Sequence, residues 1–359
     1  MEVIEGCRVD FDYVVGWLKI LSASRVLIQS PLGLRKVGRS LGKLLDAEGF
    51  VVFFSSSNCW GGCDIAYSEA SSIKVDAILH LGHSRFLKND KTPTMYVECR
   101  YADETPLTNL APRIVETIRG FRSVGLGASV QWLDHLQTLA SYLSERGISV
   151  STAEPEMYAV HPAQVLGCDA TAMKKLEGHT EAFIVVGSVF HGLGVALLTN
   201  RPTFAADPHT QKFVNLSEFK SRILMQRYAN IEAFRKAKNV GVLVSLKPGQ
   251  KRLGLALRIN RILRIHGRQS YIISSDEITS STVLENGFEG FVNTACPRLS
   301  IEDQAQFSKP VLLPAECLVA LGLMDWGEVV ENGLLMYPWG WTGREAARKF
   351  WGSLRELKV

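Results

Sequence analysis

Three cysteines stand where their thiols could share one metal centre. Cys63, Cys168 and Cys296 each precede a helical pattern, and each lies in one of three similar stretches of the chain. Because more than a hundred residues separate neighbouring members of the set, only a folded body of three parts could bring them together. Three thiolates on a metal cluster would leave one position open, which is what a catalytic cluster needs.

Cys63 and Cys168 occupy equivalent positions in two of these stretches. Each precedes an acidic residue by 13 positions, Asp76 in one case and Glu181 in the other, and each is followed directly by an aspartate. The helical patterns after them span residues 65–73 and 170–176.

The third stretch carries its cysteine at a different point. Asp276 stands at the position equivalent to Cys63, whereas Cys296 follows the third apolar strand, directly before Pro297. Proline suits the first position of a helix. We expect all three thiols at helix N-termini, where the partial positive charge would lower the thiol pKa and favour the metal-binding thiolate.

The elements that must position these thiols repeat three times. Apolar runs that begin with an acidic residue predict buried strands at residues 76–82, 181–187 and 289–295. Upstream of each we expect a strand, a helix closed by glycine and a second strand. In this order, the ranges are 25–30, 34–47 and 50–54 in the first repeat, 123–127, 132–145 and 148–151 in the second, and 240–244, 253–265 and 270–273 in the third.

This order of elements predicts an α/β fold of three similar small doubly wound parallel-sheet domains in a pseudo-threefold arrangement. We expect domains at 1–112 with Cys63, at 113–213 with Cys168, and at 214–359 with Cys296 and a C-terminal helix. Strand C-termini and helix N-termini share one edge in such sheets, so the three thiols would converge at the axis.

Composition agrees with a globular chain. The 359 residues are 46% hydrophobic and 21% charged, enough for two or three domains with cores. We expect no membrane span and no signal peptide, because 18 continuous apolar residues occur nowhere and the first ten residues lack an apolar centre. A cytoplasmic location follows, with the seven cysteines as thiols or ligands. The mild net charge of +4 permits an acidic or RNA-bound partner but does not argue for one, so we predict no direct nucleic-acid binding.

The other cysteines have simpler interpretations. Cys7, Cys99 and Cys317 are expected to be small buried hydrophobes. Cys59 forms a C-x3-C pair with Cys63, but the radical-enzyme pattern C-x3-C-x2-C fails at Ala66. A zinc site of Cys59 with the three repeat cysteines is an alternative.

The cysteine motifs resemble those of the diphthamide-synthesis radical enzymes, the 2-(3-amino-3-carboxypropyl)histidine synthases. The matching segments are Trp60-Gly-Gly-Cys63 with Gly82-His-Ser84, Val165-Leu-Gly-Cys168, Ala295-Cys-Pro-Arg-Leu-Ser300, Leu313-Pro-Ala-Glu316 and Met336-Tyr-Pro338. The resemblance spans about residues 25 to 340. The family more often has tyrosine and alanine where this chain has Trp60 and Gly62, and residues 187–191 lack charges common there.

The resemblance implies a specific reaction. Cys63, Cys168 and Cys296 would hold three irons of a 4Fe–4S cluster, leaving the fourth for S-adenosylmethionine. The reduced cluster would break the bond to the methionine Cγ, giving methylthioadenosine and a 3-amino-3-carboxypropyl radical. That radical would add to the imidazole C2 of a histidine in translation elongation factor 2, with no side chain needed as a nucleophile.

Three cysteines in one chain suggest the archaeal form of this family, which works as a homodimer. An electron donor is also implied, and the sequence does not identify it.

Polar residues at the same sheet edge are candidates to bind S-adenosylmethionine. They are Gln29, Ser30, His83, Ser84, Gly187, Ser188, Asp207, Lys247, Gln250 and Arg298. Simpler roles compete for three of them. His83 could satisfy backbone groups, Arg298 could pair with Glu302 on a helix, and Asp207 could belong to a turn.

Two other function classes stay open. Quinolinate synthase also has a pseudo-threefold α/β body with one cysteine in each unit and uses its open iron as a Lewis acid. A non-enzymatic zinc scaffold is the third class. The aromatic segment 337–342 and the amphipathic pattern 344–357 are expected to pack the chain end, and the latter could instead form a dimer contact.

Overall fold

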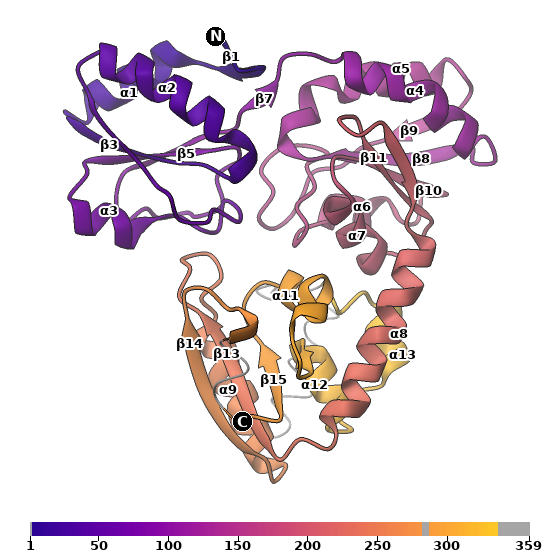
Figure 1. Cartoon of the computed structure of the whole chain (residues 1–359). Coiled ribbons are helices and arrows are strands. Elements are labelled where there is room, and N and C mark those ends of the chain that lie inside the picture. Colours follow the sequence, from indigo (N-terminus) through magenta and orange to yellow (C-terminus); the bar gives the residue numbers. More distant parts are fainter. Residues whose placement is uncertain (1, 282–286, 337–359) are drawn as a thin grey trace.

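A computed structural model describes residues 2–281 and 287–336. Its largest features are three mainly parallel sheets, which Figure 1 shows as separate groups of strands with their own helices. The first sheet has the order β4-β3-β5-β6, from β3 (Arg25–Gln29), β4 (Val51–Phe54), β5 (Ala77–Leu81) and β6 (Thr94–Val97). All its neighbouring strands are parallel.

The other two sheets repeat this order. The second is β12-β11-β10-β8-β9, with β8 (Ser123–Ala128), β9 (Ser149–Ser151), β10 (Ala182–Val186), β11 (Thr203–Asp207) and an antiparallel edge strand β12 (Lys212–Asn215). The third is β14-β13-β15-β16, with β13 (Asn239–Ser245), β14 (Gln269–Ser275), β15 (Gly290–Asn293) and β16 (Val311–Leu312). The prediction of an α/β fold with parallel sheets is confirmed.

Apolar runs form the central strands because both faces of each sheet are covered. All five residues of β5 and of β10 are buried, as are all four of β15. The covering helices are α1 (Phe11–Ile20), α2 (Arg35–Ala47), α3 (Tyr67–Ile73), α4 (Thr105–Ile118), α5 (Leu136–Ser144), α6 (Thr171–Leu176), α7 (Val189–Leu198), α8 (Ser217–Phe234), α9 (Leu253–Ile265), α11 (Arg298–Ile301), α12 (Pro314–Ala320) and α13 (Trp326–Glu331).

Most element predictions agree with the structure within a few residues. The expected helix at 253–265 is α9 without change, whereas the one expected at 132–145 begins as a 3-10 turn over Val130–His135 and becomes α-helical at Leu136. A small antiparallel sheet of β1 (Glu2–Ile4), β2 (Cys7–Val9) and β7 (Arg100–Tyr101) adds to the first part of the chain.

Two sequence expectations concern residues outside those described here, the aromatic segment 337–342 and the amphipathic pattern 344–357. Among the helices that the structure does describe, none combines the length and the apolar character that crossing a membrane requires.

A buried ion pair joins α8 to the third sheet. Figure 1 shows α8 running from the second sheet down to the third. The guanidinium of Arg227 on this helix is fully buried and donates to both carboxylate oxygens of Glu316, which is buried too. It also donates to the carbonyl oxygens of Ser300 and Val311 and to the amide oxygen of Gln304. These bonds satisfy the buried charge and fasten the segments that follow Cys296.

We predict that Arg227→Ala lowers the free energy of unfolding by roughly 3–5 kcal/mol, because it leaves the Glu316 carboxylate buried without its partner. Arg222→Ala on the same helix is a matched control, since its pair with Glu218 is largely exposed, and it should change stability by less than about 1 kcal/mol. Urea unfolding followed by circular dichroism measures both. Equal effects of the two substitutions would contradict the structural role of Arg227.

Candidate metal and cofactor site

A cavity of about 520 Å³ lies where loops from all three sheets meet. The first sheet contributes residues 58, 60–63, 82–84 and 86, and the second contributes 129–131, 164–168 and 190–191. The third contributes 245, 247, 250, 276–279, 296, 298–299, 303 and 306–307. Many of these residues follow the carboxyl end of a parallel strand, which is where doubly wound sheets bind their ligands.

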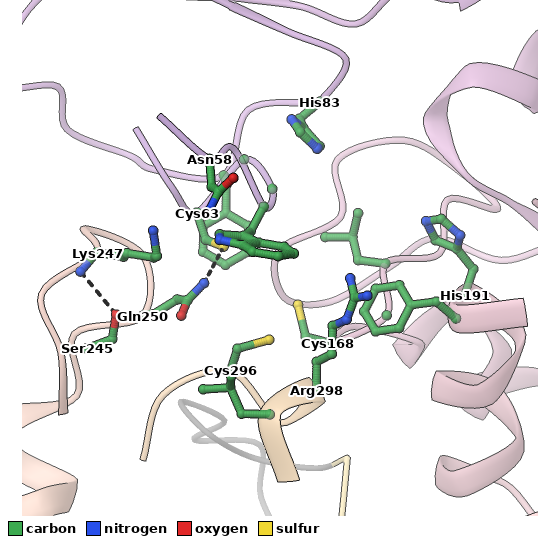
Figure 2. A pocket seen from close by; sticks show the side chains of 18 of the residues that line it. Asn58, Cys63, His83, Cys168, His191, Ser245, Lys247, Gln250, Cys296 and Arg298 are labelled. Atoms are coloured by element: carbon green, nitrogen blue, oxygen red, sulfur yellow. Dashed lines mark hydrogen bonds between the residues drawn. The ribbon is translucent and has the colours of Figure 1, made fainter. Parts of the chain in front are cut away.

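The three repeat cysteines meet in this cavity. Cys63, Cys168 and Cys296 all line it, and Figure 2 shows their sulfur atoms directed into one common space. Each of the other four cysteines lies outside the cavity lining in the described chain. Cys7, Cys99 and Cys317 are buried in the protein, as expected for small hydrophobes.

A close backbone contact brings the third sheet to the first cysteine. The amide of Gly249, in the loop after β13, donates to the carbonyl oxygen of Cys63 at 2.8 Å. A Cβ at residue 249 would lie 2.5 Å from the Cβ of Cys63, so this approach requires glycine. The side-chain amide of Gln250 then donates to the Cys63 sulfur at 3.3 Å, as Figure 2 shows.

Local packing also fixes the other two cysteines. A Cβ at Gly167 would lie 1.9 Å from the ring of Phe190, so glycine before Cys168 lets that ring pack against the loop. The side-chain amide of Asn293, at the end of β15, donates to the carbonyl oxygen of Cys296 at 2.8 Å. These contacts fix the backbone beside Cys168 and at Cys296.

The electrostatics of the thiols differ from the sequence expectation. Burial raises the pKa of Cys63, raises that of Cys168 well above its ordinary value, and raises that of Cys296 to about 12. The expected lowering by helix N-termini is wrong for the metal-free chain. The helices that follow have only seven, six and four residues, and desolvation of the thiolate outweighs their dipoles.

A metal can overcome this desolvation because it binds the thiolate directly and displaces the proton. The positive charge of Arg252 favours the thiolate form of all three cysteines. Its guanidinium donates to the carbonyl oxygen of Ala295 at 3.0 Å, next to Cys296. Three convergent thiols, the nearby positive charge of Arg252 and an adjoining cavity fit a 4Fe–4S cluster with one iron open to a ligand.

Five of the ten residues predicted to bind the cofactor line the cavity: His83, Ser84, Lys247, Gln250 and Arg298. The other five, Gln29, Ser30, Gly187, Ser188 and Asp207, are not part of its lining in the described structure.

The positions of these other residues have physical reasons. The amide of Gln29 bonds the backbone of Asp64 and Ala66 beneath the cavity. The carboxylate of Asp207 accepts from the backbone of His209 and Thr210, so it belongs to the turn between β11 and β12.

Gly187 and Ser188 lie beside His191, a residue of the cavity wall. Ser30 is buried, and the hydroxyl of Ser188 bonds Nδ1 of His191 at 3.0 Å. A Cβ at Gly187 would lie 3.3 Å from the same nitrogen. His191 itself lines the cavity, so Gly187 and Ser188 support the wall without forming it.

Lys247 reaches the cavity with its charge already paired. Its ammonium group lies 2.9 Å from a carboxylate oxygen of Asp64 and 2.9 Å from one of Glu277. The Asp64 pair is buried and joins the loop of the first cysteine to the third sheet. We therefore interpret Lys247 as a residue that fastens the Cys63 loop.

Arg298 has the geometry of an anion-binding residue. Its guanidinium lies over the rings of Trp60 and Phe190, at 5.6 Å and 5.2 Å from their centroids. Its Nε is 3.5 Å from a carboxylate oxygen of Glu302, but it is buried and makes no hydrogen bond within the described residues. Burial raises the pKa of Glu302 to about 7, so this carboxyl is an incomplete counter-ion near neutral pH.

Sequence reasoning missed several residues of the site. Arg252 lies two residues after the predicted candidate Gln250, yet only the fold brings it beside Cys296. The amide of Gln164 donates to the hydroxyl of Ser84 at 2.6 Å, and the amide of Gln131 donates to the carbonyl of Gly82 at 2.6 Å. Both glutamines join the second sheet to the Gly-His-Ser segment. Their only sequence signal is that Gln164 directly precedes the Val-Leu-Gly-Cys motif.

Comparison with known proteins agrees with this geometry. Residues 31–331 match the family described as "Putative diphthamide synthesis protein". The chain is 34% identical over 309 residues to the 2-(3-amino-3-carboxypropyl)histidine synthase of Pyrococcus horikoshii, covering 86% of this chain and 89% of that protein. It is 26% identical over 315 residues to subunit 1 of the Gallus gallus synthase, covering 85% and 74%.

A solved structure is similar as well. The crystal structure of Dph2 from Pyrococcus horikoshii with a 4Fe-4S cluster matches with a TM-score of 0.81 and 32% identity. The match covers 89% of this chain and 92% of that one.

We predict that Cys63→Ala, Cys168→Ala and Cys296→Ala each lose the visible absorbance that the unaltered chain gains on anaerobic treatment with iron and sulfide. Each substitution removes one of three ligands. Cys59→Ala should keep the absorbance, because Cys59 does not line the cavity in the described structure. The assignment of the first ligand would be wrong if Cys59→Ala lost the absorbance and Cys63→Ala kept it.

Proposed function

The chain belongs to the family of diphthamide synthesis proteins, and on that basis we propose that it is a radical 3-amino-3-carboxypropyl transferase. It transfers this group from S-adenosylmethionine to the imidazole C2 of a histidine in translation elongation factor 2, the first step of diphthamide biosynthesis. The observation that carries the proposal is the convergence of Cys63, Cys168 and Cys296 in one cavity.

When bound to these cysteines, a reduced 4Fe–4S cluster supplies the electron that breaks the bond between sulfur and Cγ of S-adenosylmethionine. The chain's own residues hold the centre and orient the substrate. Gln250 donates to the sulfur of Cys63, and Arg252 places a positive charge behind the thiolates. Both interactions stabilise negative sulfur.

Arg298 is the residue best suited to the carboxylate of the methionyl group. Its buried Nε lacks a hydrogen bond within the described residues, and its nearest carboxyl, Glu302, has a raised pKa. A guanidinium binds a carboxylate through charged hydrogen bonds of fixed direction. His83, Ser84 and Gln250 are further candidates for contacts with the cofactor, because they line the same cavity.

Aromatic side chains restrict water at the cavity wall. Trp60 and Phe190 both line the cavity and lie against the Arg298 guanidinium. Phe86 lines it too and stacks on Tyr158, with ring centroids 4.4 Å apart. Exclusion of water protects a reactive radical from side reactions.

The proposal extends to organisation and partners. We divide the chain into domains at 1–112, 113–213 and 214–359, related by a pseudo-threefold axis near the three cysteines. Elongation factor 2 is the protein substrate, and an electron donor must reduce the cluster. A homodimer of the archaeal type and a cytoplasmic location fit a chain that acts on a translation factor and has free thiols.

The two alternatives receive less support. A quinolinate synthase would share the three-cysteine arrangement, but the family match and the synthase relatives favour the transferase. A four-thiolate zinc scaffold would need Cys59 at the centre, and Cys59 does not line the cavity in the described structure.

An anaerobic assay tests the function. The protein loaded with iron and sulfide should convert S-adenosylmethionine to methylthioadenosine when dithionite is present. It should also add the 3-amino-3-carboxypropyl group to one histidine of archaeal elongation factor 2, as mass spectrometry of peptides would show. Formation of quinolinate from its small precursors, or a colourless zinc-only protein, would overturn the proposal.

Arg298→Ala should weaken S-adenosylmethionine binding by roughly 10- to 150-fold, because a hydrogen bond to a charged group contributes about 1.5–3 kcal/mol. The iron content should stay unchanged, and equilibrium dialysis with labelled S-adenosylmethionine measures the affinity. Arg85→Ala is the control, since Arg85 pairs with Asp90 and does not line the cavity in the described structure. Unaltered binding by Arg298→Ala would remove this residue from the cofactor site.

A further inference from the structure

We propose that Cys59, His80 and His83 form a second metal site, which binds a divalent ion of the zinc class. The site is separate from the three-cysteine centre. It lies in the wall of the same cavity: His83 lines the cavity, and Cys59 and His80 lie outside its lining in the described structure.

The three side chains come together from two neighbouring loops and a strand. His80 lies within β5, His83 directly follows the glycine that ends this strand, and Cys59 belongs to the loop after β4. One ligand atom from each lies within 4.8 Å of the other two. Zinc ligands at about 2.0–2.3 Å from a tetrahedral ion are roughly 3.3–3.7 Å apart, so small side-chain adjustments complete the site.

Gln29 holds His80 in the form that binds a metal. Its amide nitrogen donates to the carbonyl of Asp64 at 2.8 Å, and its amide oxygen accepts from the backbone N–H of Ala66 at 3.1 Å. Both partners are backbone groups with fixed roles, so the orientation of the amide is determined. Nδ1 of His80, 2.9 Å from the same oxygen, must therefore carry a proton and donate it.

The consequence is a lone pair on Nε2 of His80. That nitrogen lies 2.9 Å from Nδ1 of His83, on the side where Cys59 completes the group. A histidine that donates one ring N–H to an oxygen and offers the other nitrogen is the arrangement found around metal-bound imidazoles. In a metal-free chain the two histidines share a hydrogen bond, and an ion would take the place of its proton.

Charge also suits a divalent ion. Burial lowers the pKa of both histidines, that of His83 to about 4, so both imidazoles are neutral and free to act as ligands near pH 7. Burial raises the pKa of Cys59 to about 12, so a metal must displace the proton of this thiol when it binds. One thiolate and two imidazoles are ligands that zinc prefers, and a set of three leaves a position for water or a small ligand. This set distinguishes the proposed site from the all-thiolate centre beside it.

Zinc binding to the cluster-loaded protein tests the proposal. The chain is first loaded with iron and sulfide, so that Cys63, Cys168 and Cys296 are occupied, and is then dialysed against zinc with a weak chelator. We expect one zinc ion per chain with iron retained. X-ray absorption at the zinc edge should show one sulfur at about 2.3 Å and nitrogen neighbours at about 2.0 Å.

Two variants identify the ligands. Cys59→Ala and His83→Gln should each lose the zinc while keeping iron, sulfide and the unfolding midpoint. Cys7→Ala is the matched control because it removes a thiol of the same part of the chain that does not belong to this group, and it should keep the zinc. The more deeply buried His80 is left unaltered, since its loss would also disturb Gln29.

Three results would overturn the proposal. The first is a cluster-loaded protein that binds no zinc under these conditions. The second is zinc with three or more sulfur neighbours, which would place the ion at the three-cysteine centre. The third is retention of the zinc by both Cys59→Ala and His83→Gln, which would show adventitious binding elsewhere.

Discussion

The contact between the loop after β13 and the loop of Cys63 is the constraint on which the site depends. Gly249 donates its amide to the Cys63 carbonyl, Gln250 donates to the sulfur, and Lys247 pairs with Asp64. A backbone hydrogen bond, a side-chain hydrogen bond and an ion pair thus join two segments that lie nearly two hundred residues apart in the chain. They hold the Cys63 loop against the third sheet, on the same cavity wall that Cys296 lines.

This constraint has an electrostatic cost that explains why a metal belongs to the folded state. Enclosure by three sheets desolvates Cys63, Cys168 and Cys296 and raises the pKa of each thiol. The positive charge of Arg252 favours the thiolate form at all three. A bound metal replaces the lost hydration with direct bonds to sulfur, so metal binding and the packing of the three sheets around the site should stabilise each other.

The sequence predicted the scaffold well and the site only in part. Strands and helices follow from apolar runs and closing glycines, so α9 agrees without change and the three sheets share one strand order. The rule that strand C-termini share one edge of a parallel sheet identifies the correct edge. It does not say how far along that edge a residue lies from the site. Asp207 therefore ends a strand one position further out, where a hairpin with β12 uses its carboxylate. The pKa of each thiol also depends on whether desolvation or the helix dipole has the larger effect. Desolvation depends on tertiary packing, which a local sequence pattern does not show.

The two family departures in the first cysteine motif are linked in space. A Cβ at Gly62 would lie 2.8 Å from the carbonyl oxygen of Ser84, so glycine lets the motif pack tightly against the Gly-His-Ser segment. The indole of Trp60 donates to Glu277 at 3.2 Å and also faces Arg298. A tyrosine is shorter than tryptophan and has no indole N–H. The tryptophan therefore connects the first loop to the third sheet, and the glycine packs the same loop against the Gly-His-Ser segment of the first sheet.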